Sequence, residues 1–248
     1  MPDETDPTTS PSAVRRGESG AAMPGCAFCT PSALNEILTE TPHFRLVADF
    51  APLVAGHALI IPRQHFACYG AVPLSYEDEL IALKRRVARF FRARYQPAIF
   101  FEHGVFRQTV FHAHLHAFPF GPINLPLFEL AHPDGRPVRR LADVRAWYEE
   151  RGHYFYLEQA RAGEAPLEAA VFPPEEERYF HVLRSLREQA STHGGWVPAP
   201  VRRMTGGPAI AALAAAWRAW ERESPAEAPE TPESASWRQR RGADMRAP

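Results

Sequence analysis

Three histidines alternate within a short apolar run, His112, His114 and His116 in TVFHAHLHAFPF, residues 109–120. Imidazole is nucleophilic and can change its charge near neutral pH, so it can attack a substrate, carry a proton or bind a metal. Because the run alternates and is rich in Phe, Val and Leu, we predict a strand over residues 109–118. Alternate strand side chains share a face, which would place the three rings about 6–7 Å apart. The pattern alone also fits a metal-binding His-x-His pair or a polar strand face in solvent. The residues expected to face the core are Phe111, Ala113, Leu115 and Ala117.

A second group of chemically active residues lies upstream. Cys26 and Cys29 form a Cys-x-x-Cys pair, and GHALIIPRQH contains His57 and His65. Two cysteines with distant histidines can complete a tetrahedral Cys2His2 zinc site. A redox-active pair would need a strand before it, and the preceding AAMPG is a poor strand, so zinc is favoured over redox chemistry. Accidental spacing remains the third interpretation.

Composition excludes several classes of protein. The chain has 248 residues, 45% hydrophobic and 23% charged, with a net charge of −1 and a pI near 6.8. This balance offers no general basic field for bulk nucleic acid. No segment approaches the ~20 apolar residues of a membrane span, so we expect no membrane partner. The N-terminus lacks the pattern of a signal peptide, which predicts a cytoplasmic protein. Three cysteines are too few for a disulfide framework.

The order of the elements predicts an α+β protein. Its first half is expected to form an antiparallel sheet packed against a long helix that begins near Ser75 and buries Leu80, Leu83, Val87 and Phe90. The strands predicted there are 44–50, 57–62, 98–104 and 109–118. After Pro126 we predict an α/β extension with helices at 141–151, 173–189 and 208–221 and paired strands at 153–158 and 169–172. The predicted units are a disordered tail (1–23), a catalytic domain (24–125), an extension packed on it (126–221) and a second disordered tail (222–248).

Taken in order, these motifs resemble the histidine-triad (HIT) family of nucleotide hydrolases and transferases. The resemblance covers about residues 24–120 and depends on Cys-x-x-Cys, then DFAP followed by GHALIIPRQH, then QTVFHAHLHAFP. Cupin and metallo-β-lactamase motifs do not fit the residues around the triad. The resemblance implies a HIT-like sheet and helix, and a homodimer formed across that helix and a strand.

The resemblance also implies a role for each site residue. The nucleophile on the α-phosphorus of a nucleotide would be His114, with His116 hydrogen-bonded to the phosphate or leaving group and His57 beside them. A closed structural zinc would be bound by Cys26, Cys29, His65 and His112. Phosphate contacts would come from Gln108 and Thr109, with Arg107 next to them, and ribose contacts from Asp49. Gln108 and Thr109 could instead be ordinary edge residues, Asp49 could cap a turn, and Arg107 could lie on the surface.

The function that follows is hydrolysis of nucleotide phosphoanhydrides or phosphoramidates through a covalent nucleotidyl-histidine. An adenine nucleotide is the first substrate to expect. The alternatives are a transferase or phosphorylase that uses the same intermediate, and a nucleotide-binding module with vestigial activity. The sequence departs from the family at Glu102-His103-Gly104, where relatives commonly have Asn-x-Gly. Glu102 could orient a histidine or repel polyphosphate, so this departure leaves the substrate open.

Overall fold

The computed structural model describes residues 21–31, 34, 36–106, 108–119, 134–160, 167–174, 188 and 197–224. Nearly all of the two predicted tails and of the helix predicted at 173–189 lies outside these residues, as does Arg107. Among the described residues, no helix combines the length and the apolar character needed to cross a bilayer.

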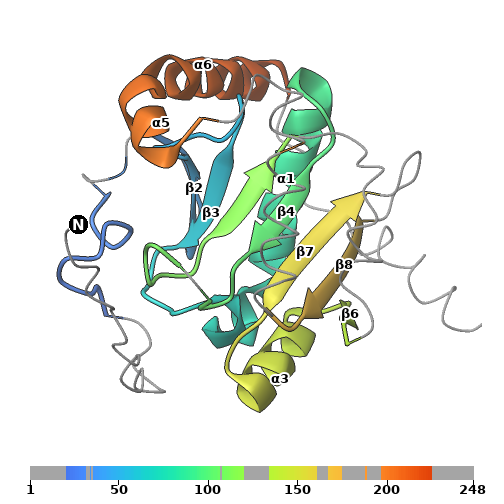
Figure 1. Ribbon diagram of the computed structural model, residues 1–248. Coiled ribbons are helices and arrows are strands. Elements are labelled where there is room, and N and C mark those ends of the chain that lie inside the picture. Colours follow the sequence, from blue (N-terminus) through green and yellow to red (C-terminus); the bar gives the residue numbers. More distant parts are fainter. Residues whose placement is uncertain are drawn as a thin grey trace, which may run out of the picture.

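Eight strands form one antiparallel sheet in the order β1-β2-β3-β5-β4-β7-β8-β6 (Figure 1). The strands are β1 (Ile37–Glu40), β2 (Phe44–Ala48), β3 (Ala58–Pro62), β4 (Ile99–Glu102), β5 (Leu115–Phe118), β6 (Arg136–Val138), β7 (Phe155–Ala160) and β8 (Leu167–Phe172). The helices are α1 (Glu77–Arg94), α3 (Leu141–Arg151), α5 (Ala199–Thr205) and α6 (Gly207–Glu223), with short 3-10 turns η2 (Tyr69–Ala71) and η3 (Leu74–Tyr76). The predicted α+β class, an antiparallel sheet with a long helix, is confirmed.

The two faces of the sheet have different partners. One face buries Leu46, Ile60, Phe100 and Leu115 in the same core as the apolar side of α1. That side is the predicted stripe, Leu80, Leu83, Val87 and Phe90, extended by Phe91. The other face carries Val47, Leu59 and Ile61, which pack with Phe28 of the N-terminal segment. Since alternate strand residues change face, His116, paired with Leu59 and Phe101, belongs to this second face.

The strand that contains the triad is shorter than predicted. β5 begins at Leu115, so His112 and His114 precede it in an irregular segment. The reason is a change of hydrogen-bond partner, because the Ala113 N–H bonds to the Phe66 carbonyl at 2.7 Å rather than to a neighbouring strand. The prediction of a strand over 109–114 is therefore wrong, and so is the core position of Phe111, whose side chain is 60% exposed. Ala113, Leu115 and Ala117 are buried as predicted.

The C-terminal half continues the sheet. α3 has the predicted bounds and ends at Gly152, which takes the left-handed conformation (φ 77°) that glycine adopts easily. β7 pairs with β4 on one side and, as predicted, with β8 on the other. Figure 1 shows α5 and α6 across one end of β2 and β3, and α3 at the opposite end of the molecule. The division into a catalytic domain and an extension stays a prediction, but strand pairing runs without a break across it.

Both elements expected to form a dimer interface already have partners in this chain. The triad strand, β5, lies between β3 and β4 and pairs with both. On α1, the Phe90 ring contacts Trp217 of α6 at 4.9 Å and Trp220 at 5.5 Å between ring centroids. The homodimer stays a prediction.

Candidate active site and metal centre

Four side chains far apart in the sequence meet at one point beside the sheet. The donor atoms of Cys26, Cys29, His65 and His112 all lie within 4.8 Å of one another, and we call these residues the metal cluster. Cys29 Sγ is 3.3 Å from His65 Nδ1 and 3.5 Å from His112 Nδ1, and Cys26 Sγ is 3.4 Å from His112 Nδ1. The structure therefore brings together all four residues that the sequence and the resemblance assigned to zinc.

The spacing of these donors fits zinc. Zn–S and Zn–N bonds of about 2.3 and 2.0–2.1 Å at tetrahedral angles imply a sulfur–nitrogen separation of about 3.5 Å. The three sulfur–nitrogen distances above, 3.3–3.5 Å, lie at or just below this value. Two thiols and two imidazoles are also a common ligand set for structural zinc, and four protein donors leave no position open for water.

Hydrogen bonds beyond the metal cluster orient its ligands. The His112 Nε2–H donates to the Pro62 carbonyl at 2.9 Å, so the lone pair of Nδ1 is directed at the two cysteines. The Met23 N–H donates to Cys29 Sγ at 3.4 Å, and the Cys29 N–H closes a turn onto the Cys26 carbonyl at 3.2 Å. Gly25 directly precedes this turn and has a φ of 80°, a conformation that favours glycine.

His114 lies next to the metal cluster but has a different kind of partner. Its Nδ1–H donates to the backbone carbonyl of His112 at 2.6 Å. In a neutral imidazole the second nitrogen then carries the lone pair, so Nε2 is the available nucleophilic atom. The side chain is buried, and burial lowers the pKa of His114 below 6.5, which favours this neutral form. The Phe28 ring packs edge-on against both His112 and His114.

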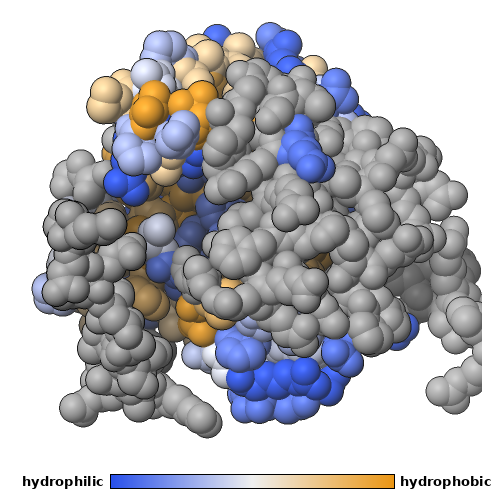
Figure 2. Space-filling view, in the orientation of Figure 1, coloured by the Kyte–Doolittle hydropathy of each residue, from blue (hydrophilic) through white to orange (hydrophobic). Residues whose placement is uncertain are grey.

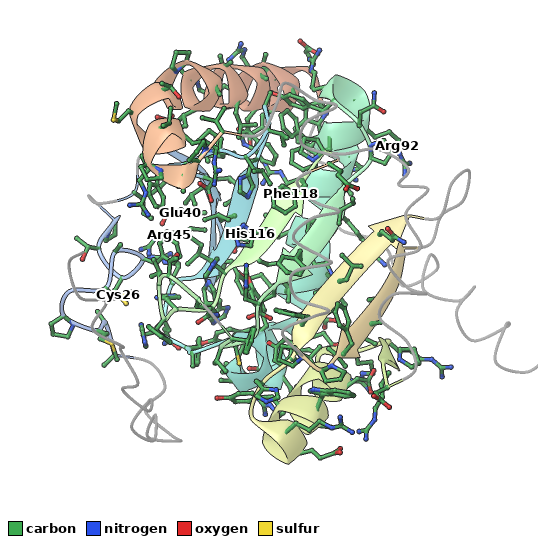
Figure 3. The ribbon with its side chains drawn as sticks, viewed as in Figure 1. Cys26, Glu40, Arg45, Arg92, His116 and Phe118 are labelled. Atoms are coloured by element: carbon green, nitrogen blue, oxygen red, sulfur yellow. The ribbon has the colours of Figure 1, made fainter. Side chains whose placement is uncertain are left out.

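His57 and His116 form a second arrangement, which we call the histidine chain. The Leu53 N–H donates to His57 Nδ1 at 3.1 Å, so that nitrogen must be an acceptor. The remaining nitrogen, His57 Nε2, therefore carries the proton and donates to His116 Nδ1 at 3.0 Å. By the same reasoning His116 carries its proton on Nε2. In Figure 3 His116 and Phe118 extend from β5, well separated from Cys26 on the N-terminal segment.

Burial keeps the histidine chain neutral. It lowers the pKa of His57 to about 4 and that of His116 well below 6.5, and the neighbouring imidazoles lower the pKa of His116 further. A proton on His116 Nδ1 would also face the proton already on His57 Nε2. The arrangement therefore presents a neutral His116 Nε2–H donor. The His114 and His116 ring centroids lie 5.0 Å apart.

The residues predicted to contact the nucleotide have different surroundings. Asp49 is buried, with Oδ2 3.8 Å from His57 Nε2, while Oδ1 accepts the Ala51 N–H at 2.6 Å. Gln108 is also buried, and neither of its amide atoms has a hydrogen-bond partner among the described residues. Buried polar groups in proteins usually have a hydrogen-bond partner, so this amide is unusual. Thr109 is exposed.

A further histidine, His103, lies beside the triad and was not predicted as a site residue. Its ring centroid is 5.8 Å from that of His116 and 6.0 Å from that of Phe155 on β7. Burial lowers the pKa of His103 to about 4. The sequence did contain a signal for this position. Phe101 pairs with His116, and His103 follows Phe101 by two residues, so alternation places His103 on the same face of the sheet as His116.

Glu102 points away from the site, and the two roles considered for it are wrong. It lies on the α1 face of the sheet, where it accepts the Tyr69 N–H at 2.8 Å and the Tyr154 O–H at 2.5 Å. Burial raises the pKa of Glu102 to about 8. The carboxyl group thus joins β4 to η2 and to the segment before β7, and it neither orients a triad histidine nor meets a phosphate.

Comparison with known proteins agrees with this geometry. Residues 31–121 match the HIT domain family. A HIT-like protein of Mycobacterium tuberculosis is 31% identical over 107 residues, an alignment that covers 70% of that protein and 38% of this chain. The chain belongs to the HIT family. The HIT match ends before β6, so α3, β7, β8, α5 and α6 lie outside it.

Comparison with solved structures also finds HIT proteins, at lower similarity. A zinc-bound histidine triad protein from Mycobacterium smegmatis is 24% identical, with 51% of this chain and 96% of that one covered and a TM-score of 0.35. A HIT family hydrolase from Clostridium thermocellum is 26% identical, with 42% and 95% covered and a TM-score of 0.33. A HIT family protein from Bacillus anthracis is 23% identical, with 39% and 73% covered and a TM-score of 0.35.

Proposed function

We propose that this HIT protein hydrolyses a nucleotide phosphoanhydride or phosphoramidate through a covalent nucleotidyl-His114. The observation that carries the proposal is the hydrogen bond from His114 Nδ1–H to the His112 carbonyl, which leaves Nε2 unprotonated on a ring whose centroid lies 5.0 Å from that of His116. A module that only bound nucleotides would have no use for a nucleophile held in this tautomer.

The first step forms one bond and breaks one. The lone pair of His114 Nε2 attacks the α-phosphorus, an N–P bond forms, and the bond from phosphorus to the leaving group breaks. A phosphate leaving group departs as an anion, whereas an amine must gain a proton. The His116 Nε2–H is placed to hydrogen-bond the departing atom or, for an amine, to supply that proton.

The second step returns the enzyme to its starting state. Water attacks phosphorus, the N–P bond breaks, and the electron pair returns to His114 Nε2. If His116 Nε2 gave its proton to an amine leaving group, the proton released by the water returns to that nitrogen. If the leaving group took no proton, the proton from the water goes to the product phosphate. His57 supports both steps, since its Nε2–H holds His116 in the tautomer with a donor at Nε2.

The metal cluster would hold zinc as a structural clip. Zinc there would fix the N-terminal segment and the position of His112, whose carbonyl sets the tautomer of His114. Three protein segments meet at this point: residues 26–29, His65 after β3, and His112 of the triad. A metal clip between them contributes to folding.

The substrate is expected to be an adenine nucleotide. Asp49 would accept hydrogen bonds from the ribose hydroxyls, and Gln108 and Thr109 would bind the phosphate. The unpartnered amide of Gln108 supports a phosphate ligand, because it is buried and has both a donor and an acceptor to offer. Arg107, outside the described residues, is proposed as an additional phosphate contact.

Product analysis tests this function. The purified protein is incubated with a panel of dinucleoside polyphosphates and nucleoside phosphoramidates of all four bases, with and without inorganic phosphate, and the products are identified by mass. Hydrolysis predicts a nucleoside monophosphate in both conditions. A product that gains a phosphate when phosphate is present would make the protein a phosphorylase. Binding without any product would overturn the proposed activity.

A further inference from the structure

Helix α5 contacts three consecutive residues of the loop between β2 and β3. The Arg203 guanidinium lies over the Phe50 ring, with its carbon 4.9 Å from the ring centroid. The Arg202 Nε–H donates to the Ala51 carbonyl at 3.0 Å. Gly206, directly after α5, packs so closely on Pro52 that an added Cβ would lie 2.7 Å from Pro52 Cδ. The surface is recessed below α5, and both hydrophilic and hydrophobic residues lie in the recess (Figure 2).

This loop carries the groups that set up the proposed nucleotide site. It begins at Asp49, whose carboxylate accepts the Ala51 N–H, and it contains the Leu53 N–H that donates to His57 Nδ1. The backbone of Ala51 is therefore held on both sides, by Asp49 through its N–H and by Arg202 through its carbonyl. Leu53 is two residues further on, so the position of its amide depends on the same loop conformation.

Arg202 fastens the loop to the C-terminal segment by two bonds. Besides Ala51, its guanidinium donates from Nη1 to the carbonyl of Val197, which precedes α5. An arginine can bond two separate carbonyls at once because its donors diverge from one rigid plane, whereas a lysine offers a single charged centre. Its side chain is half-buried, which limits screening by water.

We propose that Arg202 is a positioning residue of the nucleotide site, and that the C-terminal helix α5 is a working part of that site. Arg202 holds the loop so that the Leu53 amide fixes the tautomer of His57 and Asp49 keeps its orientation toward the nucleotide sugar. The proposal rests on the proposed function for its effect on turnover, but its effect on His57 does not require any turnover.

The charge of Arg202 acts in the same direction as its hydrogen bonds. The guanidinium opposes protonation of His57, whose pKa is already lowered by burial. A neutral His57 with its proton on Nε2 is the state that the histidine chain needs. Removal of Arg202 therefore loosens the loop and at the same time makes the imidazolium form of His57 less unfavourable.

The experiment compares Arg202→Ala and Arg202→Lys with Arg218→Ala. Arg218 of α6 also joins the C-terminal helices to the sheet region, but its 3.0 Å bond is to Glu36, outside the loop. The first readout is the imidazole nitrogen NMR spectrum, which reports the tautomer of His57 and His116. The second readout is steady-state kinetics on the substrate found by product analysis, with kcat and KM determined separately. Thermal unfolding checks that each variant is folded.

We expect Arg202→Ala to replace the single His57 tautomer by a mixture and to lower kcat/KM about 10- to 100-fold, the effect of a small displacement in an active site. Arg202→Lys should fall between Ala and wild type, and Arg218→Ala should match wild type. An unchanged His57 spectrum in folded Arg202→Ala and Arg202→Lys would overturn the positioning role. A changed spectrum in a protein that converts no nucleotide would uphold it and overturn the proposed function instead.

Discussion

The metal cluster and the histidine chain are both built from buried or half-buried imidazoles, yet they are suited to opposite tasks. In the metal cluster, His65 and His112 turn acceptor nitrogens toward two thiols, so that four donors converge on one point. In the histidine chain, each nitrogen of His57 meets a partner of matching polarity, and the series ends in a free donor on His116. The difference lies in the partner of the first ring nitrogen, which decides what the second nitrogen can do.

His114 lies between these two regions and depends on both. Its tautomer is set by the backbone of His112, a residue of the metal cluster, while its ring faces His116 of the histidine chain. In the proposed mechanism, the metal cluster would fix the orientation of the nucleophile and the histidine chain would serve the leaving group. Each can be removed separately, which gives the following predictions.

The largest effect is expected for His114→Asn. Loss of the covalent step should lower kcat by several orders of magnitude, whereas nucleotide binding and zinc content should stay near wild type because both neighbouring regions are intact. Steady-state kinetics with calorimetric titration of nucleotide separates the two effects. Near-wild-type turnover by this variant would remove His114 from the role of nucleophile.

Next in size is Cys26→Ser, which breaks the metal cluster. We expect loss of the zinc equivalent and a fall of more than about 2 kcal/mol in the free energy of unfolding, with activity lowered as a consequence. Zinc analysis and urea unfolding provide the measurement. Cys68→Ala is the matched control, since Cys68 is buried in the core under α1 and should lose stability without losing zinc. A Cys26→Ser protein that keeps one zinc per chain would contradict the assignment.

A smaller effect is expected in the histidine chain. His57→Asn and His116→Asn should each lower kcat/KM about 10- to 1,000-fold, and His116→Asn should be most harmful for leaving groups that need a proton. Because the two rings act in series, the double variant should lose little more than the worse single variant. Measuring kcat/KM for the wild type, the two single variants and the double variant gives the coupling energy between His57 and His116. Losses that simply multiply would show that His57 and His116 act independently.

The smallest effect on activity is expected for Glu102, on the face of the sheet opposite to both regions. Burial raises its pKa from the usual 4.5 to about 8, so the folded protein binds more protons than the unfolded chain between these pH values. Stability should therefore fall as the pH rises from about 4.5 to about 8, by on the order of 4 kcal/mol from this group. Glu102→Gln, which cannot ionise, should show a flatter profile in urea unfolding from pH 5 to 8.5. Its activity at pH 7 should stay within a few-fold of wild type, because Glu102 has no contact with the site. Identical pH profiles for the two proteins would contradict the raised pKa.

The residues of the site could largely be found from the sequence, because their types and spacing are chemically restrictive. Cys26, Cys29, His65 and His112 meet as expected, and the bounds of α3 follow from its helical pattern and Gly152. What failed depended on contacts between distant segments. The strand was expected to begin near residue 109, but the bond from Ala113 to Phe66 interrupts it, and no local pattern reports such a bond.

The same limit explains the missed roles of Glu102 and Arg202. The partners of Glu102, Tyr69 and Tyr154, are 33 and 52 residues away, and Arg202 bonds Ala51 across 151 residues. From the sequence alone, Glu102 resembles a site residue and Arg202 resembles a surface residue. Only the packing shows their partners. His103 is different, because its place on the triad face follows from strand alternation alone.

The central claim is that His114 Nε2 becomes covalently bound to the nucleotide phosphorus. Its most direct test is a rapid-quench reaction of the wild-type protein with a nucleotide labelled at the α-phosphorus, followed by digestion under alkaline conditions and mass mapping of the labelled peptide. The account predicts an acid-labile, alkali-stable nucleotidyl group on His114 that forms and decays at the rate of turnover and is absent from His114→Asn. Turnover with no label on the chain at any quench time, or label on a different residue, would contradict it.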